Sequence, residues 1–223
     1  MWRGLIRRLD RARLTDPRFA FLFEKGPPDE AVALDCEATG LDPRRDEILA
    51  VAAIRIRGGR ILASESFRAT LRSARPSSPA AIKVHRLLGA EIRQGLDPAA
   101  MLPELLRFIG GRPIVGYYTD FDVRLLDRHA RRMLRIRLPN PRIDVSALYY
   151  ACKYRGAPDY VKIDLSFARI AADLGLPPLP QHDAFNDALM TAMMYVQLSD
   201  MLERRATIPR RAAEPVESAA FGA

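Results

Sequence analysis

One stretch constrains the fold more than any other, because an apolar run ends there in two closely spaced carboxylates. Residues 31–34 are apolar, and Asp35 and Glu37 follow them just before a Thr39-Gly40 turn. Residues i and i+2 of a strand project from the same face, so the two carboxylates are predicted to lie side by side at the end of a buried strand. Like charges that close disfavour each other's ionisation unless a cation lies between them. The stretch therefore predicts a site for a hard divalent cation, which prefers carboxylate oxygens.

Composition and charge narrow the class of protein. The 223 residues are 48% hydrophobic, which suits one domain with modest extensions. The net charge of +8 favours a polyanionic partner, nucleic acid before an anionic membrane, although Arg-rich chains also come from GC-rich genomes. Cys36 and Cys152 lack a metal-ligand spacing, which argues against a zinc site or a disulfide framework. No apolar run suits a signal peptide or a membrane span, so we expect a cytoplasmic protein without integral membrane insertion.

The pattern along the chain indicates three regions. Residues 1–28 form a basic leader, with apolar residues at helical spacing (positions 2, 5, 6 and 9), and a Gly-Pro-Pro linker. We expect this helix to pack on the domain; a helix that touches a membrane or a partner is the alternative. Residues 29–203 form the main domain. Residues 204–223 mix Pro, Ala, Glu and Arg without apolar periodicity, and we expect a disordered tail.

The main domain is predicted to be α/β. A hairpin turn at Gly58-Gly59 joins the second and third strands, so the first three strands are antiparallel neighbours. Alternating helices and strands then imply a mixed sheet covered by helices. The predicted strands are 31–35, 48–56, 61–71, 113–117 and 142–144, and the predicted helices are about 82–88, 98–109, 121–134, 145–154, 164–174 and 183–203.

Two further polar motifs stand at predicted helix starts. Phe121-Asp122 follows the strand at 113–117, where Asp120 competes with Asp122 as a helix cap. His182 follows a proline-rich loop and precedes Asp187 in the first turns of the last long helix. Each residue alone is ordinary, because single acids at helix starts are often caps and a lone histidine is usually structural. Their combination with the strand-end Asp-x-Glu points to one acidic site.

This combination resembles the DEDDh branch of the ribonuclease-H-like 3′→5′ exonucleases, which includes the proofreading epsilon subunit of bacterial DNA polymerase III. The resemblance spans roughly residues 31–202. In the second motif the family often has His-Asn ahead of Phe-Asp, whereas this chain has Tyr117-Tyr118. The matching positions are Asp35, Glu37, Thr39 and Gly40 in the first motif, Phe121 and Asp122 in the second, and His182, Ala184, Asp187, Ala188, Thr191 and Ala192 in the third.

The resemblance implies a fold, a reaction and a cofactor. The fold is a ribonuclease-H-like mixed sheet, with three antiparallel strands followed by parallel strands and flanked by helices. The reaction is hydrolysis of phosphodiester bonds at the 3′ end of single-stranded or frayed DNA, releasing nucleoside 5′-monophosphates. His182 is the implied general base. The implied cofactor is a pair of divalent metal ions, Mg²⁺ or Mn²⁺, held by Asp35, Glu37, Asp122 and Asp187.

Substrate contacts are also implied by the resemblance. Thr39, Gly40 and Leu41 form a turn that offers backbone N–H groups and a Leu wedge to the terminal nucleotide. His85 belongs to a segment that resembles the family's Val/Ile-His-Gly-Ile, with Arg86 in place of the glycine. Further candidates are Phe121 near the terminal base or in the core, the arginines of 124–137 on phosphates or on a solvated face, and Tyr149, Tyr150, Tyr154 and Tyr160 against bases or in helix interfaces.

Two rival functions remain open at this point. One is an RNA-trimming exoribonuclease of the same family. The other is a catalytically idle module that binds nucleic acid or a polymerase, although an idle protein has no physical need to keep four mutually repelling acids together. The expected partners are nucleic acid 3′ ends and, for a proofreading role, a DNA polymerase subunit.

Overall fold

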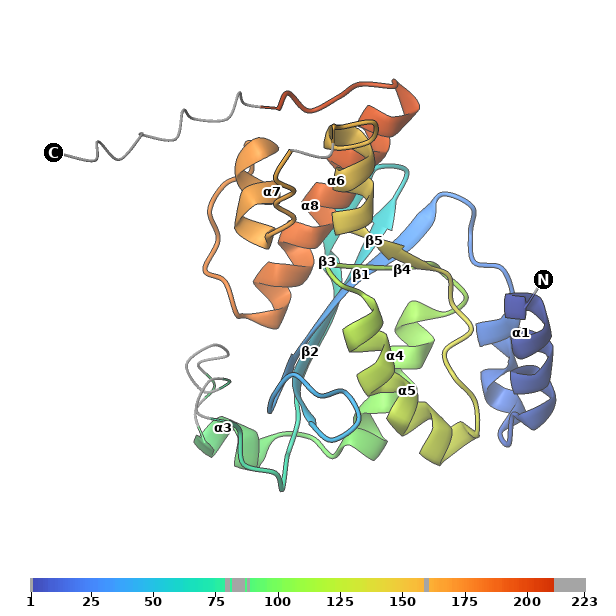
Figure 1. Ribbon diagram of the computed structural model, residues 1–223. Coiled ribbons are helices and arrows are strands. Elements are labelled where there is room, and N and C mark those ends of the chain that lie inside the picture. The colour runs from blue at the N-terminus through green and yellow to red at the C-terminus, as the bar shows by residue number, and fades with distance from the viewer. Residues whose placement is uncertain (1, 79–80, 82–86, 88, 159–160, 211–223) are drawn as a thin grey trace, which may run out of the picture.

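The core of the computed structural model is a five-stranded sheet with strand order β3-β2-β1-β4-β5 (Figure 1). The structure describes residues 2–78, 81, 87, 89–158 and 161–210. Strands β1, β2 and β3 are antiparallel neighbours, and β4 and β5 continue the sheet in parallel to β1. This confirms the predicted mixed sheet. The strands are β1 (Glu30–Ala38), β2 (Ile48–Arg57), β3 (Arg60–Thr70), β4 (Ile114–Gly116) and β5 (Arg142–Asp144).

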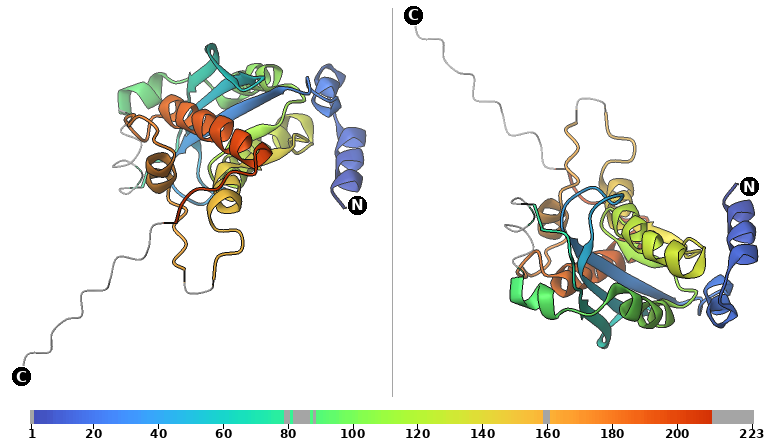
Figure 2. Two further views of the ribbon diagram at one scale, coloured as in Figure 1. Left: turned by 90° about the horizontal axis from the view of Figure 1, so that it is seen from above. Right: turned by 90° about the horizontal axis from the view of Figure 1, so that it is seen from below.

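Helices cover both faces of this sheet. Helices α4 and α5 lie on one face, and α6, α7 and α8 lie on the other (Figures 1 and 2). The short helix expected at 82–88 falls almost entirely outside the described residues. The helical elements are α1 (Trp2–Arg13), the 3-10 helix η1 (Pro17–Phe23), α3 (Gly89–Gln94), α4 (Pro98–Ile109), α5 (Asp120–Leu134), α6 (Val145–Lys153), α7 (Phe167–Asp173) and α8 (Ala184–Glu203).

Strand β1 is buried on both faces, and its alternation divides its side chains between two cores. Val32 and Leu34 pack with α4 and α5, whereas Ala31 and Ala33 pack in the cluster that contains α6 and α8. The same alternation continues past residue 34. Asp35 and Glu37 therefore belong to the α8 face, and Cys36 belongs to the core under α4 and α5.

The leader packs on the domain through a different face than its apolar pattern indicates. Leu5 and Leu9 are 54% and 46% exposed. The contacts come from polar residues instead: the Arg7 guanidinium donates to the Pro139 and Phe23 carbonyls at 2.6 and 2.7 Å, and Asp10 is buried against Arg137 at 3.2 Å. Helix η1 then inserts buried aromatic and leucine side chains into the core on the α4 and α5 face.

The C-terminal boundary also differs from the expected one. Residues 204–210 pack against the domain. The Ile208 N–H donates to the Cys152 carbonyl at 3.1 Å, and the Ile208 side chain is buried. The expectation of a disordered tail from residue 204 is therefore wrong for this segment, while 211–223 lie outside the described residues. Among the helices that the structure describes, none has the length and apolar character of a membrane span.

Candidate active site

Strand β1 carries the first two carboxylates to the α8 face of the sheet. On the neighbouring strand β2, Asp35 pairs with Ala52 and Glu37 pairs with Ala50. Both partners are alanines, so no bulky side chain from β2 fills the space beside the carboxylates. Asp35 is half-buried and Glu37 is only 9% exposed. The sequence prediction that these two acids share one face is confirmed by the strand register.

Helix α5 brings the third carboxylate to the same strand. The Cys36 backbone N–H donates to Asp122 Oδ1 at 3.1 Å, and Asp122 is 4% exposed. The competing residue Asp120 points elsewhere, because it forms an ion pair with Arg142 at 2.7 Å and its side chain is 67% exposed. The structure therefore places Asp122, and not Asp120, beside the strand-end acids.

Helix α8 supplies the remaining pair. His182 has φ 66°, a left-handed conformation uncommon for histidine, and its backbone N–H donates to Asp187 Oδ2 at 2.9 Å. Asp183 caps the helix by accepting from the Asn186 N–H at 2.9 Å. Ligand atoms of Glu37, His182 and Asp187 all lie within 4.8 Å of one another. Residues 150 positions apart in the sequence thus meet at one point.

The four acids strongly perturb one another. Burial and the charges of Asp122, Asp187 and Glu37 raise the pKa of Asp35 well above its usual range. Burial, with the charges of Asp187 and Asp183, raises the pKa of Glu37 to about 7. Burial also raises the pKa of Asp122 to about 8, although the Cys36 N–H hydrogen bond opposes this. Without a cation, the repulsion among these carboxylates destabilises the folded chain.

The same cluster has the donor set that a hard divalent cation takes. It gathers carboxylate oxygens and one imidazole at ligand distance, and Asp187 Oδ1 is buried with no hydrogen-bond partner in the described part of the chain. A buried carboxylate oxygen without a donor is costly unless a cation or water completes it. The residues present therefore fit a divalent metal site.

This electrostatic strain predicts a pH dependence of stability. Unfolded carboxyl groups titrate near ~4, so above that pH the folded metal-free chain keeps protons that the unfolded chain has lost. Its free energy of unfolding should therefore fall as pH rises from ~4 and level off above about 8, where the folded chain has also lost these protons. His129 acts in the opposite direction only around and below ~6.5, because burial and the charges of Arg128 and Arg132 lower its pKa.

In chelator, we expect thermal denaturation to give a Tm about 5 °C or more lower at pH 8.5 than at pH 6.5. Mn²⁺ or Mg²⁺ at pH 8.5 should restore the loss, because a bound cation replaces the protons. A Glu37→Gln variant serves as the control and should show a flatter pH profile. A Tm that rises with pH in chelator would contradict the charge arrangement.

The turn after β1 is held by a network centred on Asp46. Its carboxylate accepts from Thr39 Oγ1 at 2.9 Å and from the Asp42 N–H at 2.8 Å, and it forms an ion pair with Arg75 at 3.3 Å. A Cβ at Gly40 would lie 2.6 Å from Asp46 Oδ2, so only glycine fits beside this carboxylate. The network fixes the turn that carries the predicted substrate contacts.

Loosening this turn should weaken substrate binding. Asp46→Asn removes an acceptor from Thr39 or Asp42, and we expect about 1–2 kcal/mol lower stability and a KM raised several-fold with a smaller change in kcat. Asp42→Asn is the matched control, because the exposed Asp42 carboxylate accepts from the Arg44 N–H and lies 3.7 Å from the exposed Arg45 guanidinium, both within the same turn. Steady-state kinetics on a labelled oligonucleotide and urea denaturation measure both effects. Equal KM values for the two variants would remove the positioning role.

The remaining predicted substrate residues have different surroundings. Leu41 is 91% exposed at the tip of the turn, which suits a wedge. Phe121 is half-buried against the core under α4 and α5, in line with the core-packing alternative. His85 lies outside the described residues, as does Tyr160. Tyr149 is fully buried in the helix interface, again the core-packing alternative.

The arginines of α5 are not a uniform phosphate-binding face. The Arg128 guanidinium donates to the backbone carbonyls of Pro43 and Asp46, so this side chain holds the turn after β1. Arg137 is engaged by Asp10. Arg124, Arg131 and Arg132 remain exposed. The sequence showed helical spacing but not which arginines have backbone partners.

Of the two tyrosines that stand where the family often has His-Asn, Tyr117 has a structural role. The Tyr117 hydroxyl donates to the Leu165 carbonyl at 3.0 Å, and its ring meets Phe167 edge-on at 5.2 Å. Tyr118, with φ 50°, is 52% exposed next to it. Tyr117 thus ties the end of β4 to α7.

One feature of the site, a cation–π stack between β3 and α8, was not predicted from the sequence. The Arg68 guanidinium stacks over the Phe185 ring, 3.1 Å from its centroid. Both residues line a pocket of about 250 Å³ that Glu37 and His182 also line. The pairing joins β3 to α8 across more than 100 residues, so no local signal marks it. Its exposed cation beside the acidic cluster suits an anionic substrate.

Comparisons with known proteins find similar sequences over most of this chain. A family model described as "Exonuclease" (RNase_T) matches residues 32–195. The chain is 28% identical over 174 residues to the PolC-type DNA polymerase III of Thermotoga maritima, covering 78% of this chain but only 12% of that protein. It is 26% identical over 172 residues to the DNA polymerase III subunit epsilon of Aquifex aeolicus, covering 77% and 81%.

A solved structure shares the fold at low sequence identity. Escherichia coli exonuclease I in complex with a dT13 oligonucleotide superposes with a TM-score of 0.66 at 18% identity. The match covers 79% of this chain and 42% of that one. The fold around the acidic cluster is therefore one that known proteins also use.

Proposed function

This chain belongs to the DnaQ-like exonuclease family and is a nuclease, and we propose that it removes nucleotides one at a time from the 3′ end of single-stranded or frayed DNA. The observation that carries the proposal is the convergence of Asp35, Glu37, Asp122 and Asp187, with His182, around the C-terminal end of β1. The names of the relatives, which are DNA polymerase III proteins, support DNA over RNA. They also support a polymerase subunit as partner and a cytoplasmic location.

We assign the four carboxylates to two divalent ions, Mg²⁺ or Mn²⁺. Bound there, the ions supply Lewis-acid stabilisation of phosphoryl charge and lower the pKa of water. The chain's part is to hold the carboxylates in place before substrate arrives: the Cys36 N–H fixes Asp122, and the His182 N–H fixes Asp187. Preformed ligands need little rearrangement on binding, which favours catalysis.

His182 is the proposed general base. Its backbone is anchored to Asp187, and one of its ring nitrogens lies within 4.8 Å of a carboxylate oxygen of Glu37 and of Asp187. An imidazole in this position can take the proton of the attacking water.

The turn of Thr39, Gly40 and Leu41 is the proposed contact with the terminal nucleotide. Gly40 lets the turn pass close to the Asp46 carboxylate, and the exposed Leu41 side chain can insert beside the terminal base. Arg68 on the Phe185 ring, in the pocket that Glu37 and His182 also line, offers guanidinium donors to a phosphate.

A gel time course with 5′-labelled single-stranded DNA and RNA of one sequence tests the proposal. Each strand is incubated with Mg²⁺, Mn²⁺ or chelator. We expect a descending ladder on DNA that requires metal, with mononucleotide 5′-phosphates as product. A faster ladder on RNA would replace DNA by RNA as substrate. No ladder on either strand, with binding intact, would overturn the catalytic proposal in favour of a binding module.

A further inference from the structure

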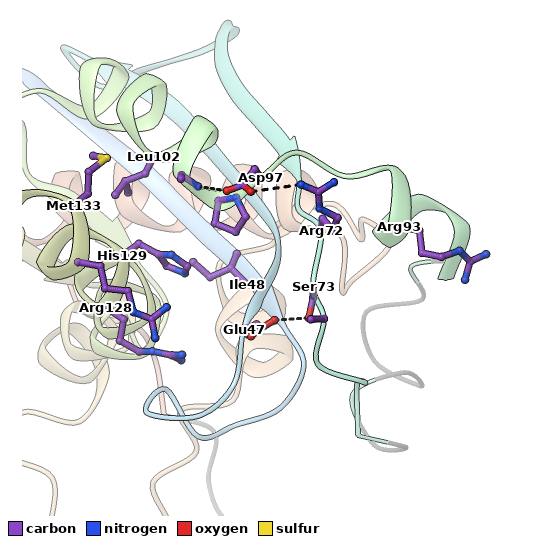
Figure 3. A pocket seen from close by; sticks show the side chains of 14 residues that line it. Glu47, Ile48, Arg72, Ser73, Arg93, Asp97, Leu102, Arg128, His129 and Met133 are labelled. Atoms are coloured by element: carbon purple, nitrogen blue, oxygen red, sulfur yellow. Dashed lines mark hydrogen bonds and ion pairs between the residues drawn. The ribbon is translucent and has the colours of Figure 1, made fainter.

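A second pocket, of about 730 Å³, lies between α4 and α5 (Figure 3). We call it the α4–α5 pocket. Its walls come from residues 47–48 at the start of β2, residues 72–74 after β3, Arg93 of α3, the first turns of α4, and Arg128, His129, Arg132 and Met133 of α5. Neither the metal-binding proposal nor the substrate turn uses it.

The floor of the α4–α5 pocket is apolar. Ile48 and Leu102 lie at its base but are each about 1% exposed, so a ligand meets the half-buried Met133 and His129 side chains instead (Figure 3). The His129 ring lies next to this floor. Burial and the charges of Arg128 and Arg132 lower the pKa of His129, so the ring is neutral near pH 7. A flat, uncharged group such as a nucleobase suits these surroundings.

The rim of the pocket carries positive charge, because its two acidic residues already have partners within the chain. Glu47 accepts from the Ser73 hydroxyl at 2.7 Å, and Asp97 is occupied by Arg72 at 3.4 Å and by the Ala99 N–H at 2.8 Å. Within the described residues, Arg132 has neither an ion pair nor a hydrogen bond, and it is exposed. An apolar floor with free positive charge at its edge matches the chemistry of a nucleotide: a base for the floor and a phosphate for the arginine.

The α4–α5 pocket borders the turn after β1. The Thr39 N–H of that turn donates to the carbonyl of the pocket residue Glu47 at 3.0 Å, and Ile48 pairs with Ala38 on β1. Glu37 precedes Ala38 on that strand and faces the other side of the sheet. A strand whose 3′ end lies at the acidic cluster would have to cross this turn to reach the pocket.

We propose that the α4–α5 pocket binds an upstream nucleotide of the single-stranded substrate, with a phosphate on Arg132 and the base against Met133 and the His129 ring. The inference rests on the proposed function, because it assumes a single strand with its 3′ end at the acidic cluster. The pocket gives long strands a contact that short strands cannot reach, so affinity rises with strand length.

Fluorescence anisotropy with 5′-labelled oligothymidylates of four and twelve residues tests this, in chelator so that strands stay intact. Arg132→Ala should weaken binding of the 12-mer about fivefold at low salt and reduce its salt slope by about 0.7, as for one lost phosphate contact. Binding of the 4-mer should be unchanged. Arg131→Ala is the matched control, because Arg131 is the exposed neighbour on α5 that does not line this pocket.

Two results would overturn the inference. Equal losses for Arg131→Ala and Arg132→Ala would mean diffuse charge and no pocket. Unchanged 12-mer binding in Arg132→Ala would remove the contact. A metal-dependent ladder on the 12-mer, run in parallel, tests the proposed function independently of these outcomes.

Discussion

An Asp187→Asn variant is expected to lose nuclease activity by about 10³-fold or more, while the metal-free protein becomes more stable. Asp187 Oδ1 is buried in the acidic cluster and has no hydrogen-bond partner among the described residues. The charge of Asp187 raises the pKa of both Asp35 and Glu37. Asparagine keeps the shape and can still accept from the His182 N–H, but it removes the negative charge that a cation needs. Activity and stability should therefore move in opposite directions.

Asp183→Asn is the matched control for this result. Asp183 is an exposed acid four residues earlier that caps α8, and asparagine caps helices as well as aspartate does. We expect its activity to stay within a few-fold of wild type. Gel assays measure activity, and denaturation in chelator measures stability. If Asp183→Asn proved as inactive as Asp187→Asn, the loss would reflect negative charge at the start of α8 and not metal ligation by Asp187.

An Asp173→Ala variant is expected to lose about 3–5 kcal/mol of stability, the largest folding effect of any single change away from the site. Lys153 is only 5% exposed, and its ammonium bonds to Asp173 and to the Tyr149 hydroxyl. That hydroxyl donates to Asp173 at 2.5 Å, and Arg169 lies 3.3 Å from the other carboxylate oxygen. Removing Asp173 leaves a buried ammonium and a buried hydroxyl without their shared acceptor.

Lys153→Met provides the contrast. It removes the buried charge and leaves Asp173 with its Tyr149 and Arg169 contacts, so we expect a loss well below that of Asp173→Ala. The double variant with Asp173→Ala should recover part of the single-variant loss. Urea denaturation of the three variants gives the comparison. A loss for Asp173→Ala below about 1 kcal/mol would mean that water already satisfies Lys153.

The features that local periodicity encodes were predictable from the sequence. The alternation along β1 predicted that Asp35 and Glu37 share a face and that Cys36 points away, and the glycine pair at 58–59 predicted the β2–β3 hairpin. The motif around His182 predicted the start of α8 within a residue or two. These inferences succeed because strand and helix repeats act over a few residues.

Features that depend on distant partners were not predictable. Arg128 has the spacing of a solvent-facing arginine, yet it donates to carbonyls more than 80 residues earlier. The apolar stripe of α1 indicated its packing face, but Arg7 and Asp10 make the contacts instead. The stack of Arg68 on Phe185 likewise joins two elements with no local link. Such choices are set by which surfaces meet in the folded chain.

The residues of the acidic cluster are far apart in the sequence, and this separation determines when the cluster can assemble during folding. The hairpins of β1, β2 and β3 are local and can form early, whereas α8 must return across most of the chain to pack on β1. Asp187 and His182 leave the ribosome long after Asp35 and Glu37. A growing or C-terminally truncated chain therefore carries three of the four carboxylates but lacks Asp187 and His182, and we expect hydrolytic capacity to appear only once α8 has docked. Late assembly of this kind keeps a nuclease harmless to nearby nucleic acid while it is being made.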